Sequence, residues 1–451
     1  MPHSAHVLVA AADDADRGRL AVTLADSGYR VSAACTGQRA LALMGELKPD
    51  VVVLGPSLPD AELSAIAADM KAADDPATAA RIVVVAPGIS EGMRGRCVVA
   101  GADDVVDGPI HPAVVLARMK PLCRLSTMQA ELRRRVATAS SLGIDVVADP
   151  LAFEPSGACN VMVVAKPGGM AERAVRSALD SGFALTMESD PYRAGTTVES
   201  ERFDAMVLAA DGKRAAAEPM LYLASHLRNN PSLFNLPVMM LHAPGIFEDD
   251  GDPYRYGASM AMGLPLEKAA LASGIHILVR RQRARWAIRE AFDAVFHAVA
   301  PRQKANVYPQ HFFDAHLARV VDAAHRDGRN LSIVHFTLHN LADIKRKHFA
   351  EAGEILAAKV ATWVTGLVRI EDMVARVGDD ELCVVLPDTA QEEAAAMAQR
   401  IGAILSSSEF HLSEEVMHPI KVWVDGGCAA LEAGDTAQTL VQRARSTLFP
   451  Q

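Results

Sequence analysis

The chain has 451 residues, of which 50% are hydrophobic and 22% charged, and its formal net charge at pH 7 is −10. This length exceeds what one core accommodates, so we expect two to four globular domains and not a disordered chain. The negative balance argues against a general binder of nucleic acid or anionic membrane, because the mean field repels polyanions. A local basic site remains compatible with this charge.

The chain also lacks the usual signals for export or membrane insertion. Its N-terminus has no basic flank followed by a long apolar stretch, and no run of about 18 apolar residues predicts a transmembrane helix. Six cysteines lie far apart without a CxxC pair: Cys35, Cys97, Cys123, Cys159, Cys383 and Cys428. We therefore predict a cytoplasmic chain with buried free thiols, no disulfides and no zinc site.

The first third of the chain alternates short apolar runs with segments of helical spacing. The runs cover residues 6–11, 29–34, 50–55, 81–86 and 103–107. This alternation predicts a parallel sheet with helices on both faces. A helix from residue 111 onward closes the pattern; we expect it to continue past the domain, with a kink at Pro121.

A second copy of the pattern begins near residue 160, after a Pro- and Gly-bearing linker at residues 149–158. Its predicted strands cover residues 160–165, 203–210, 237–243 and 258–264. It ends in a long helix that carries a basic run. We interpret this run as a solvated helix face; the alternative is a contact with a partner. The run consists of Arg280, Arg281, Arg283 and Arg285.

The last part of the chain is again α/β, with predicted strands at residues 331–338, 382–387 and 420–427. Residues 369–389 read "RIEDMVARVGDDELCVVLPDT", in which two apolar runs flank the polar tip "GDDE" and predict a hairpin. The expected domains are residues 1–140, 155–285 and 286–451.

Five strands and five helices in about 120 residues suggest a flavodoxin-like doubly wound fold. More closely, the first two domains resemble receiver domains of two-component signalling. The resemblance implies a nucleophilic carboxylate at the end of the third strand and Mg²⁺ held by it and by an acidic pair after the first strand. It also implies a Lys and a Ser or Thr at the phosphoryl group.

These chemical positions are replaced in both domains. In the first they are Gly55 for the nucleophile, Ala11 and Ala12 (followed by Asp13 and Asp14) for the acidic pair, Ala86 for the hydroxyl and Gly108 for the Lys. In the second they are Ala209 for the nucleophile, Lys166 and Pro167 for the acidic pair and Leu264 for the Lys. Asp60 and Asp211 are interpreted as turn residues. Because glycine cannot be phosphorylated and Mg²⁺ needs carboxylates, we predict two pseudo-receivers that serve dimer contacts or docking.

The third domain resembles the cyclase domain of PleD-type diguanylate cyclases, with Gly378, Asp379, Asp380, Glu381 and Leu382 at the GGDEF or GGEEF loop. That resemblance implies condensation of two GTP molecules with two metal ions. The sequence departs from it at the metal-binding Asp (Thr337), at a second common Asp (His339) and at the Lys and Asn of the next helix (Ala342, Lys345).

The loop itself departs from the pattern at its second glycine, which is Asp379. A carboxylate about 4 Å from a phosphate costs about 4 kcal/mol at an effective dielectric of 20, so GTP binding is opposed. Only Asp380 remains of the metal carboxylates, and His339 is interpreted as an ordinary hydrogen-bonded residue. We therefore predict no catalytic residue, no metal site and no cofactor.

A second motif of the family is retained. Arg369 and Asp372 form an RxxD five residues before the loop, and Arg400 lies on the following helix. The resemblance implies that these three bind cyclic di-GMP, the cyclase product. An arginine fork suits guanine O6/N7 or a phosphate, and a carboxylate accepts from guanine N1–H and N2–H. The alternative is a surface ion pair, since an isolated RxxD is a weak signal.

Two features depart from the family around this motif. The gapless match in the second domain yields no receiver arginine that would clamp the ligand. The chain also stops at "ARSTLFPQ", short of the family's last strand, which predicts a trimmed domain.

The architecture is similar to that of degenerate PleD-like effectors of the PopA type. We predict a non-enzymatic cyclic di-GMP effector that pairs as a homodimer and responds to the ligand by a population shift. The resemblance implies an adaptor at the cell pole that recruits an RcdA-like partner and delivers regulators such as CtrA to the ClpXP protease. The alternatives are a ligand-independent scaffold or a weakly active cyclase; Gly55 and Ala209 count against a phosphorelay protein.

Overall fold

The computed structural model describes residues 5–73, 80–107, 111–146, 158–179, 182–210, 212, 214–301, 307–348, 351–412, 419–447 and 449–450. The chain divides into two compact units. The N-terminal unit comprises residues 6–126 and 151–287, and the C-terminal unit comprises residues 1–5, 127–150 and 288–451. Helices α5 (Pro112–Ser141) and α10 (Lys268–Val299) supply residues to both units.

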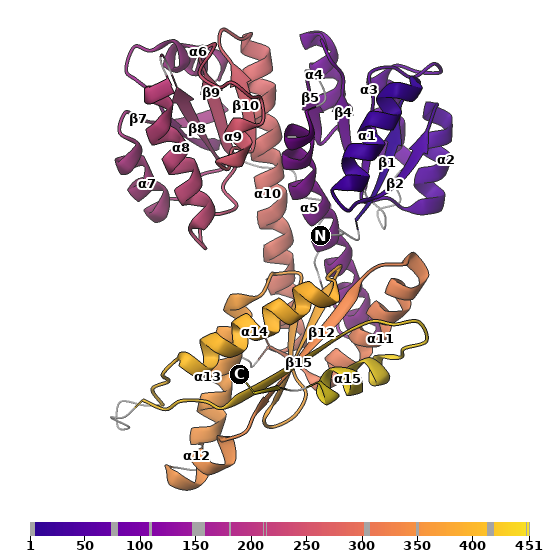
Figure 1. Ribbon diagram of the computed structural model, residues 1–451, viewed down its shortest axis with the longest axis vertical. Coiled ribbons are helices and arrows are strands. Elements are labelled where there is room, and N and C mark those ends of the chain that lie inside the picture. Colours follow the sequence, from indigo (N-terminus) through magenta and orange to yellow (C-terminus); the bar gives the residue numbers. More distant parts are fainter. Residues whose placement is uncertain are drawn as a thin grey trace. The chain divides into compact units, whose positions relative to one another are not determined.

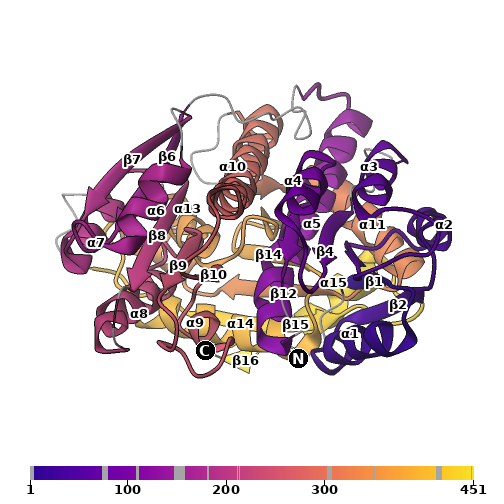
Figure 2. The same cartoon turned by 90° about the horizontal axis from the view of Figure 1, so that it is seen from above.

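The first sheet of the N-terminal unit is parallel, with strand order β2-β1-β3-β4-β5. Apolar strand residues form its core, and helices cover both faces (Figures 1 and 2). The helix N-termini are capped by polar side chains, such as Thr36, which accepts from the Arg39 amide. The elements are β1 (His6–Ala10), α1 (Asp14–Asp26), β2 (Arg30–Ala34), α2 (Gly37–Leu47), β3 (Val51–Leu54), α3 (Leu63–Ala73), β4 (Arg81–Val85), α4 (Glu91–Val99), β5 (Asp104–Val106) and the start of α5.

The second sheet is also parallel, with strand order β10-β9-β8-β6-β7. Its edge strand β7 is missing from the predicted strands, because Thr186 and Glu188 break the apolar run and only Phe183 is buried. The elements are β6 (Cys159–Val164), α6 (Met170–Ala178), β7 (Phe183–Glu188), α7 (Pro191–Ser200), β8 (Ala205–Ala210), α8 (Arg214–Asn229), β9 (Val238–His242), α9 (Asp252–Arg255), β10 (Met260–Gly263) and the start of α10.

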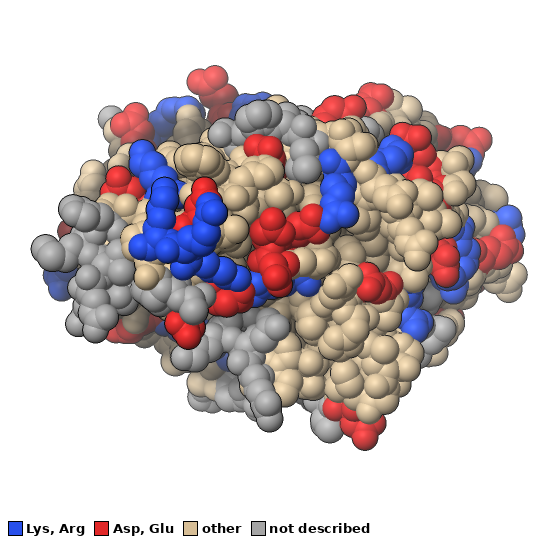
Figure 3. Space-filling view, turned by 90° about the horizontal axis from the view of Figure 1, so that it is seen from below, with Lys and Arg blue, Asp and Glu red and all other residues tan. Residues whose placement is uncertain are grey.

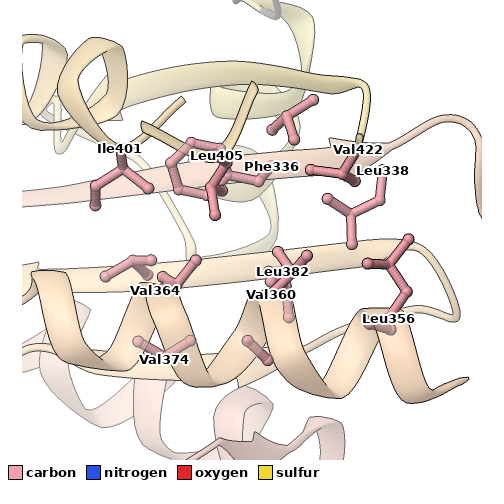
Figure 4. Close-up of a cluster of buried hydrophobic side chains, with 14 of the residues drawn as sticks. Phe336, Leu338, Leu356, Val360, Val364, Val374, Leu382, Ile401, Leu405 and Val422 are labelled. Atoms are coloured by element: carbon pink, nitrogen blue, oxygen red, sulfur yellow. The ribbon is translucent and has the colours of Figure 1, made fainter. Parts of the chain in front are cut away.

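The C-terminal unit contains a six-stranded sheet of order β11-β13-β14-β12-β15-β16, antiparallel except for the β11–β13 pair. Phe336, Leu382 and Leu405 belong to the core beside this sheet, to which the strands and helices α12, α13 and α14 all contribute (Figure 4). The elements are β11 (Tyr308–Pro309), α11 (Gln310–Asp327), β12 (Leu331–Leu338), α12 (Leu341–Lys347), α13 (Ala352–Leu367), β13 (Met373–Arg376), β14 (Glu381–Pro387), α14 (Gln391–Ser407), β15 (Val424–Ala430), α15 (Ala437–Ser446) and β16 (Phe449–Pro450).

Several expectations from the sequence require correction. The strand predicted at residues 420–427 is β15, which begins at Val424, and the short β16 pairs with it, so a last strand is present. All six cysteines are free, but only four are buried as predicted, since Cys35 is exposed and Cys159 is half-buried. Helix α5 runs on to Ser141, as expected, with Pro121 inside it; the kink at Pro121 stays a prediction. The linker at residues 149–157 lies outside the described residues. In the described part of the chain, no helix combines the length and apolar character needed to cross a membrane.

Candidate functional site

In the first sheet, close packing leaves no room for a side chain at the position of a receiver nucleophile. Gly55 follows β3, and its amide donates to the Ala10 carbonyl oxygen over 2.7 Å. A Cβ built on Gly55 would lie 2.5 Å from the Cβ of Ala11, and Ala11 and Ala86 are both buried. A side chain larger than hydrogen at residue 55 therefore requires the β1 and β3 ends to separate.

The carboxylates near this position are engaged in helix capping. Asp13 is the N-cap of α1 and accepts from the Asp16 amide, while Asp14 pairs with Arg17. Asp60 accepts from the Gly37 and Gln38 amides at the start of α2. These amides lower the pKa of Asp60, which thus caps the N-terminus of α2, a role that the prediction of a turn residue did not include.

In the second sheet, Ala209 and Leu264 are buried and Lys166 and Pro167 are exposed. None of these four side chains is a carboxylate. Gly108 and Asp211, which the sequence also singled out, lie outside the described residues. The positions that are described therefore offer no phosphoryl acceptor at either strand end.

In the C-terminal unit, the predicted hairpin is formed by β13 and β14, with the polar tip at residues 377–380. Thr337 of β12 lies opposite Glu381, and the Leu338 amide donates to the Asp380 carbonyl oxygen. His339 lies beside this edge, where its Nε2 is 2.7 Å from Asp425 Oδ2. His339 is thus hydrogen-bonded, as the sequence analysis expected.

The loop tip is held by charged neighbours from two elements. Arg376 donates to the carbonyl oxygens of Gly378 and Asp379, and Glu354 of α13 accepts from both Arg376 and Lys345. The hydrogen bond from Arg376 is the largest effect that lowers the pKa of Glu354, to about 2. On the face seen from below, Lys and Arg side chains lie beside Asp and Glu side chains (Figure 3). Among the described residues, no group of three His, Cys, Asp or Glu side chains is placed to hold a metal ion.

The RxxD motif forms a turn between α13 and β13. The Asp372 amide donates to the Arg369 carbonyl oxygen over 3.1 Å, and Asp372 Oδ2 accepts from the Arg369 amide over 2.8 Å. Arg369 is exposed, and its guanidinium forms no hydrogen bond or ion pair within the described part of the chain. Arg369 and Asp372 therefore do not form the surface ion pair that was the alternative interpretation.

The three predicted ligand residues lie close together but differ in exposure. Arg400 of α14 is exposed, and its Nη2 donates over 3.3 Å to the carbonyl oxygen of Leu367, two residues before Arg369. Asp372 is only 5% exposed, and its Oδ1 has no hydrogen-bond partner among the described residues. Burial, followed by the nearby Glu371, raises the pKa of Asp372 to about 7.

Sequence reasoning missed a contact of this turn with α5. Arg135 of α5 donates to the Glu371 carbonyl oxygen over 2.7 Å, and its guanidinium lies 4.6 Å from the ring centroid of Phe292. Glu131, one helical turn earlier, accepts from Arg135 Nε and lies 2.8 Å from His316 Nε2. The only available signal was a Glu and an Arg at i,i+4 spacing on a predicted helix.

Comparison with known proteins agrees with this architecture. Residues 303–450 match the family model described as diguanylate cyclase, GGDEF domain. The response regulator PleD of Caulobacter vibrioides is 26% identical over 455 residues, covering 99% of this chain and 96% of that protein. Over nearly its whole length the chain is therefore similar to this response regulator. Its N-terminal region is receiver-type, its C-terminal domain is a GGDEF domain, and the predicted α/β fold class is confirmed.

Two further matches each cover one part of the PleD-like chain. The transcriptional regulatory protein KdpE of Mycobacterium tuberculosis is 33% identical over 127 residues, covering 28% of this chain and 54% of that protein. The GGDEF domain of DgcB from Caulobacter crescentus, solved in complex with c-di-GMP, is 18% identical, with a TM-score of 0.30. That match covers 32% of this chain and 81% of the DgcB domain chain. The GGDEF domain and the similarity to PleD place the chain in cyclic di-GMP-related signalling.

Proposed function

We propose that the chain is a non-enzymatic effector that binds cyclic di-GMP through Arg369, Asp372 and Arg400. The observation that carries the proposal is the RxxD turn. Its Arg369 guanidinium is exposed and unpaired among the described residues, beside Arg400 and the unpartnered Oδ1 of Asp372. Two arginine forks and one carboxylate acceptor complement the phosphates and the Watson–Crick edge of a guanine dinucleotide.

The catalytic side of the domain supports the non-enzymatic part of the proposal. Thr337 supplies no metal-binding carboxylate, His339 is bonded to Asp425, and Asp379 adds negative charge at the loop. Lys345 is paired with Glu354, so its charge is already partly compensated. Of the family's metal carboxylates, Asp380 alone is retained in the described part of the chain, too few for two metal ions on a triphosphate.

Incubation of the full chain with GTP and Mg²⁺ tests this part. We expect no cyclic di-GMP above a protein-free control, as measured by chromatography of the nucleotides. Formation of cyclic di-GMP that requires Asp380, as shown by its loss in Asp380→Ala, would contradict the proposal and identify a weakly active cyclase.

Ligand affinity is expected to rise with pH, because only the ionised Asp372 accepts from guanine N1–H and N2–H. With a pKa of about 7 for this carboxyl, the ionised fraction is about tenfold smaller at pH 6 than at pH 8, and so is the affinity. Glu371, Arg369 and Arg135 of α5 are the other charged groups that act on it. Calorimetric titrations at pH 6, 7 and 8 measure the trend, which Asp372→Asn should abolish. Equal affinity at all three values would contradict this role of Asp372.

The buried position of Asp372 suggests how binding is transmitted. A guanine reaches Oδ1 only if the turn opens, and Arg135 bonds the carbonyl of Glu371 within the same turn to α5. Cyclic di-GMP therefore favours one conformation of the turn and of the helix that contacts it, which is a population shift. In the PopA-type role, the favoured state docks an RcdA-like partner at the cell pole for regulated proteolysis, with the chain as a homodimer.

A further inference from the structure

The basic run of α10 is not the solvated face that the sequence suggested. Arg283 is only 7% exposed and pairs with Asp204, with 2.7 Å between Nε and Oδ1, and Arg280 donates to the Ala102 carbonyl oxygen. Arg281 and Arg285 line a pocket of about 250 Å³ in the N-terminal unit. Two arginines of the run therefore form structural contacts, and the other two line a cavity.

This pocket is basic and contains no acid. Lys120 of α5, Arg228 of α8 and Arg281 and Arg285 of α10 contribute to its wall, and none of the described residues that line it is Asp or Glu. The guanidinium of Arg124 is also close to the pocket, because it lies 5.7 Å from the ring centroid of the lining residue Phe234. Four cationic side chains around one cavity stand out in a chain with a net charge of −10.

The charge of Arg281 has no counterion among the described residues. Its Nη1 is buried without a hydrogen-bond partner. The carboxylate that acts on its charge, Asp104, is already engaged by Arg118, with 2.6 Å between Nε and Oδ2. Burial lowers the pKa of Arg281 to about 10, so the group is still charged at neutral pH. A half-buried guanidinium with a buried, unpartnered Nη1 is costly and favours a bound anion.

Arg228 shows the same lack of an acidic partner. Among the described residues it donates only to oxygens of neutral groups, including the carbonyls of Gly257, Phe234 and Leu236. Burial and then the neighbouring Arg281 lower the pKa of Arg228 to about 10. Two guanidinium groups that repel each other at one cavity are stabilised together when a dianion binds between them.

We propose that this pocket, lined by Lys120, Arg228, Arg281 and Arg285, binds a small phosphate-bearing anion. A volume of about 250 Å³ is below the range of about 300–1,000 Å³ for drug-sized ligands, so inorganic phosphate or a small phosphomonoester fits and a dinucleotide does not. The bound anion contacts α5 together with α8 and α10, so it also links the two receiver-like parts of the N-terminal unit. The site is separate from Arg369, Asp372 and Arg400.

Titration of the full chain with inorganic phosphate and, separately, with glycerol 3-phosphate tests the proposal, with ionic strength held constant by sodium chloride. Binding should raise the unfolding temperature in proportion to the logarithm of the ligand concentration above Kd, by about 5 °C at a hundredfold excess over Kd. A larger effect of glycerol 3-phosphate identifies a phosphomonoester as the ligand, and equal effects identify the phosphate group alone.

Arg281→Met separates binding from a structural role. Without phosphate this variant should unfold at least at the temperature of the wild type, because the cation that it removes has a buried Nη1 without a partner among the described residues. Its phosphate affinity should fall at least about tenfold. Lys120→Gln changes an exposed lining residue and should also weaken binding. Arg289→Met, an exposed position on the same helix, is the matched control and should bind as the wild type does.

Two results would overturn the proposal. One is a wild-type response that sodium chloride reproduces at the same ionic strength. The other is unchanged phosphate affinity in both Arg281→Met and Lys120→Gln. Arg369→Ala should keep the full phosphate response, which distinguishes this site from the proposed cyclic di-GMP site.

Discussion

Replacement of Arg369 by alanine is expected to weaken cyclic di-GMP binding by a hundredfold or more. The exposed guanidinium can donate two charge-assisted hydrogen bonds to the ligand, each worth about 1.5–3 kcal/mol. Because Arg369 has no side-chain hydrogen bond to the described residues, its removal should leave the stability of the fold nearly unchanged. Calorimetric titration measures the affinity, and circular dichroism measures the folded state.

A matched control is Arg346→Ala, which removes an exposed arginine of α12 that pairs with Asp343. Binding by this variant should equal that of the wild type. If Arg369→Ala binds cyclic di-GMP as tightly as the wild type, the ligand does not use the RxxD turn.

Replacement of Glu131 by alanine should lower the free energy of unfolding of the C-terminal unit by about 3–5 kcal/mol. Glu131 is fully buried, and its Oε1 contacts both Arg135 and His316. Burial opposes its ionisation, but His316 and Arg135 outweigh burial and lower its pKa to about 2. Removal of this carboxylate leaves Arg135 uncompensated in the interior. Urea denaturation followed by circular dichroism measures the loss.

The same contacts predict the pH dependence of this stabilisation. A carboxyl whose pKa is depressed in the folded state stabilises the fold above its ordinary value of 4.5, and this contribution is lost as the pH falls toward 2. Glu432→Ala is the control, because Glu432 pairs with Arg443 at an exposed site and its loss should cost no more than about 1 kcal/mol. Equal losses for the two variants would contradict the role assigned to Glu131.

The sequence predicted most of the fold because its buried strands are continuous apolar runs. Residues 51–54 and 205–210 are examples, and each forms a central strand with both neighbours in place. Strand β7 escaped prediction because an edge strand keeps polar residues, and its Thr186 and Glu188 interrupt the pattern. The start of β15 was misplaced because the apolar residues 422–424 continue the run before pairing begins.

The candidate sites also contain parts that the sequence predicted and parts that it did not. Arg369 and Asp372 lie three residues apart, so their turn could be expected from the sequence. The contact of Arg135 with Glu371 joins residues 236 positions apart, and only the packing of α5 against the turn creates it. The pocket at Arg281 likewise combines residues of three helices, so the basic run of α10 alone indicated a solvated surface.

The central claim is that this GGDEF domain binds cyclic di-GMP at the RxxD turn. Its most direct test is a calorimetric titration of cyclic di-GMP into the wild-type full chain at pH 8, where Asp372 is ionised. We predict saturable binding with a Kd in the micromolar range or tighter. No heat of binding, together with no ligand retained in equilibrium dialysis, would contradict the claim and favour a ligand-independent scaffold.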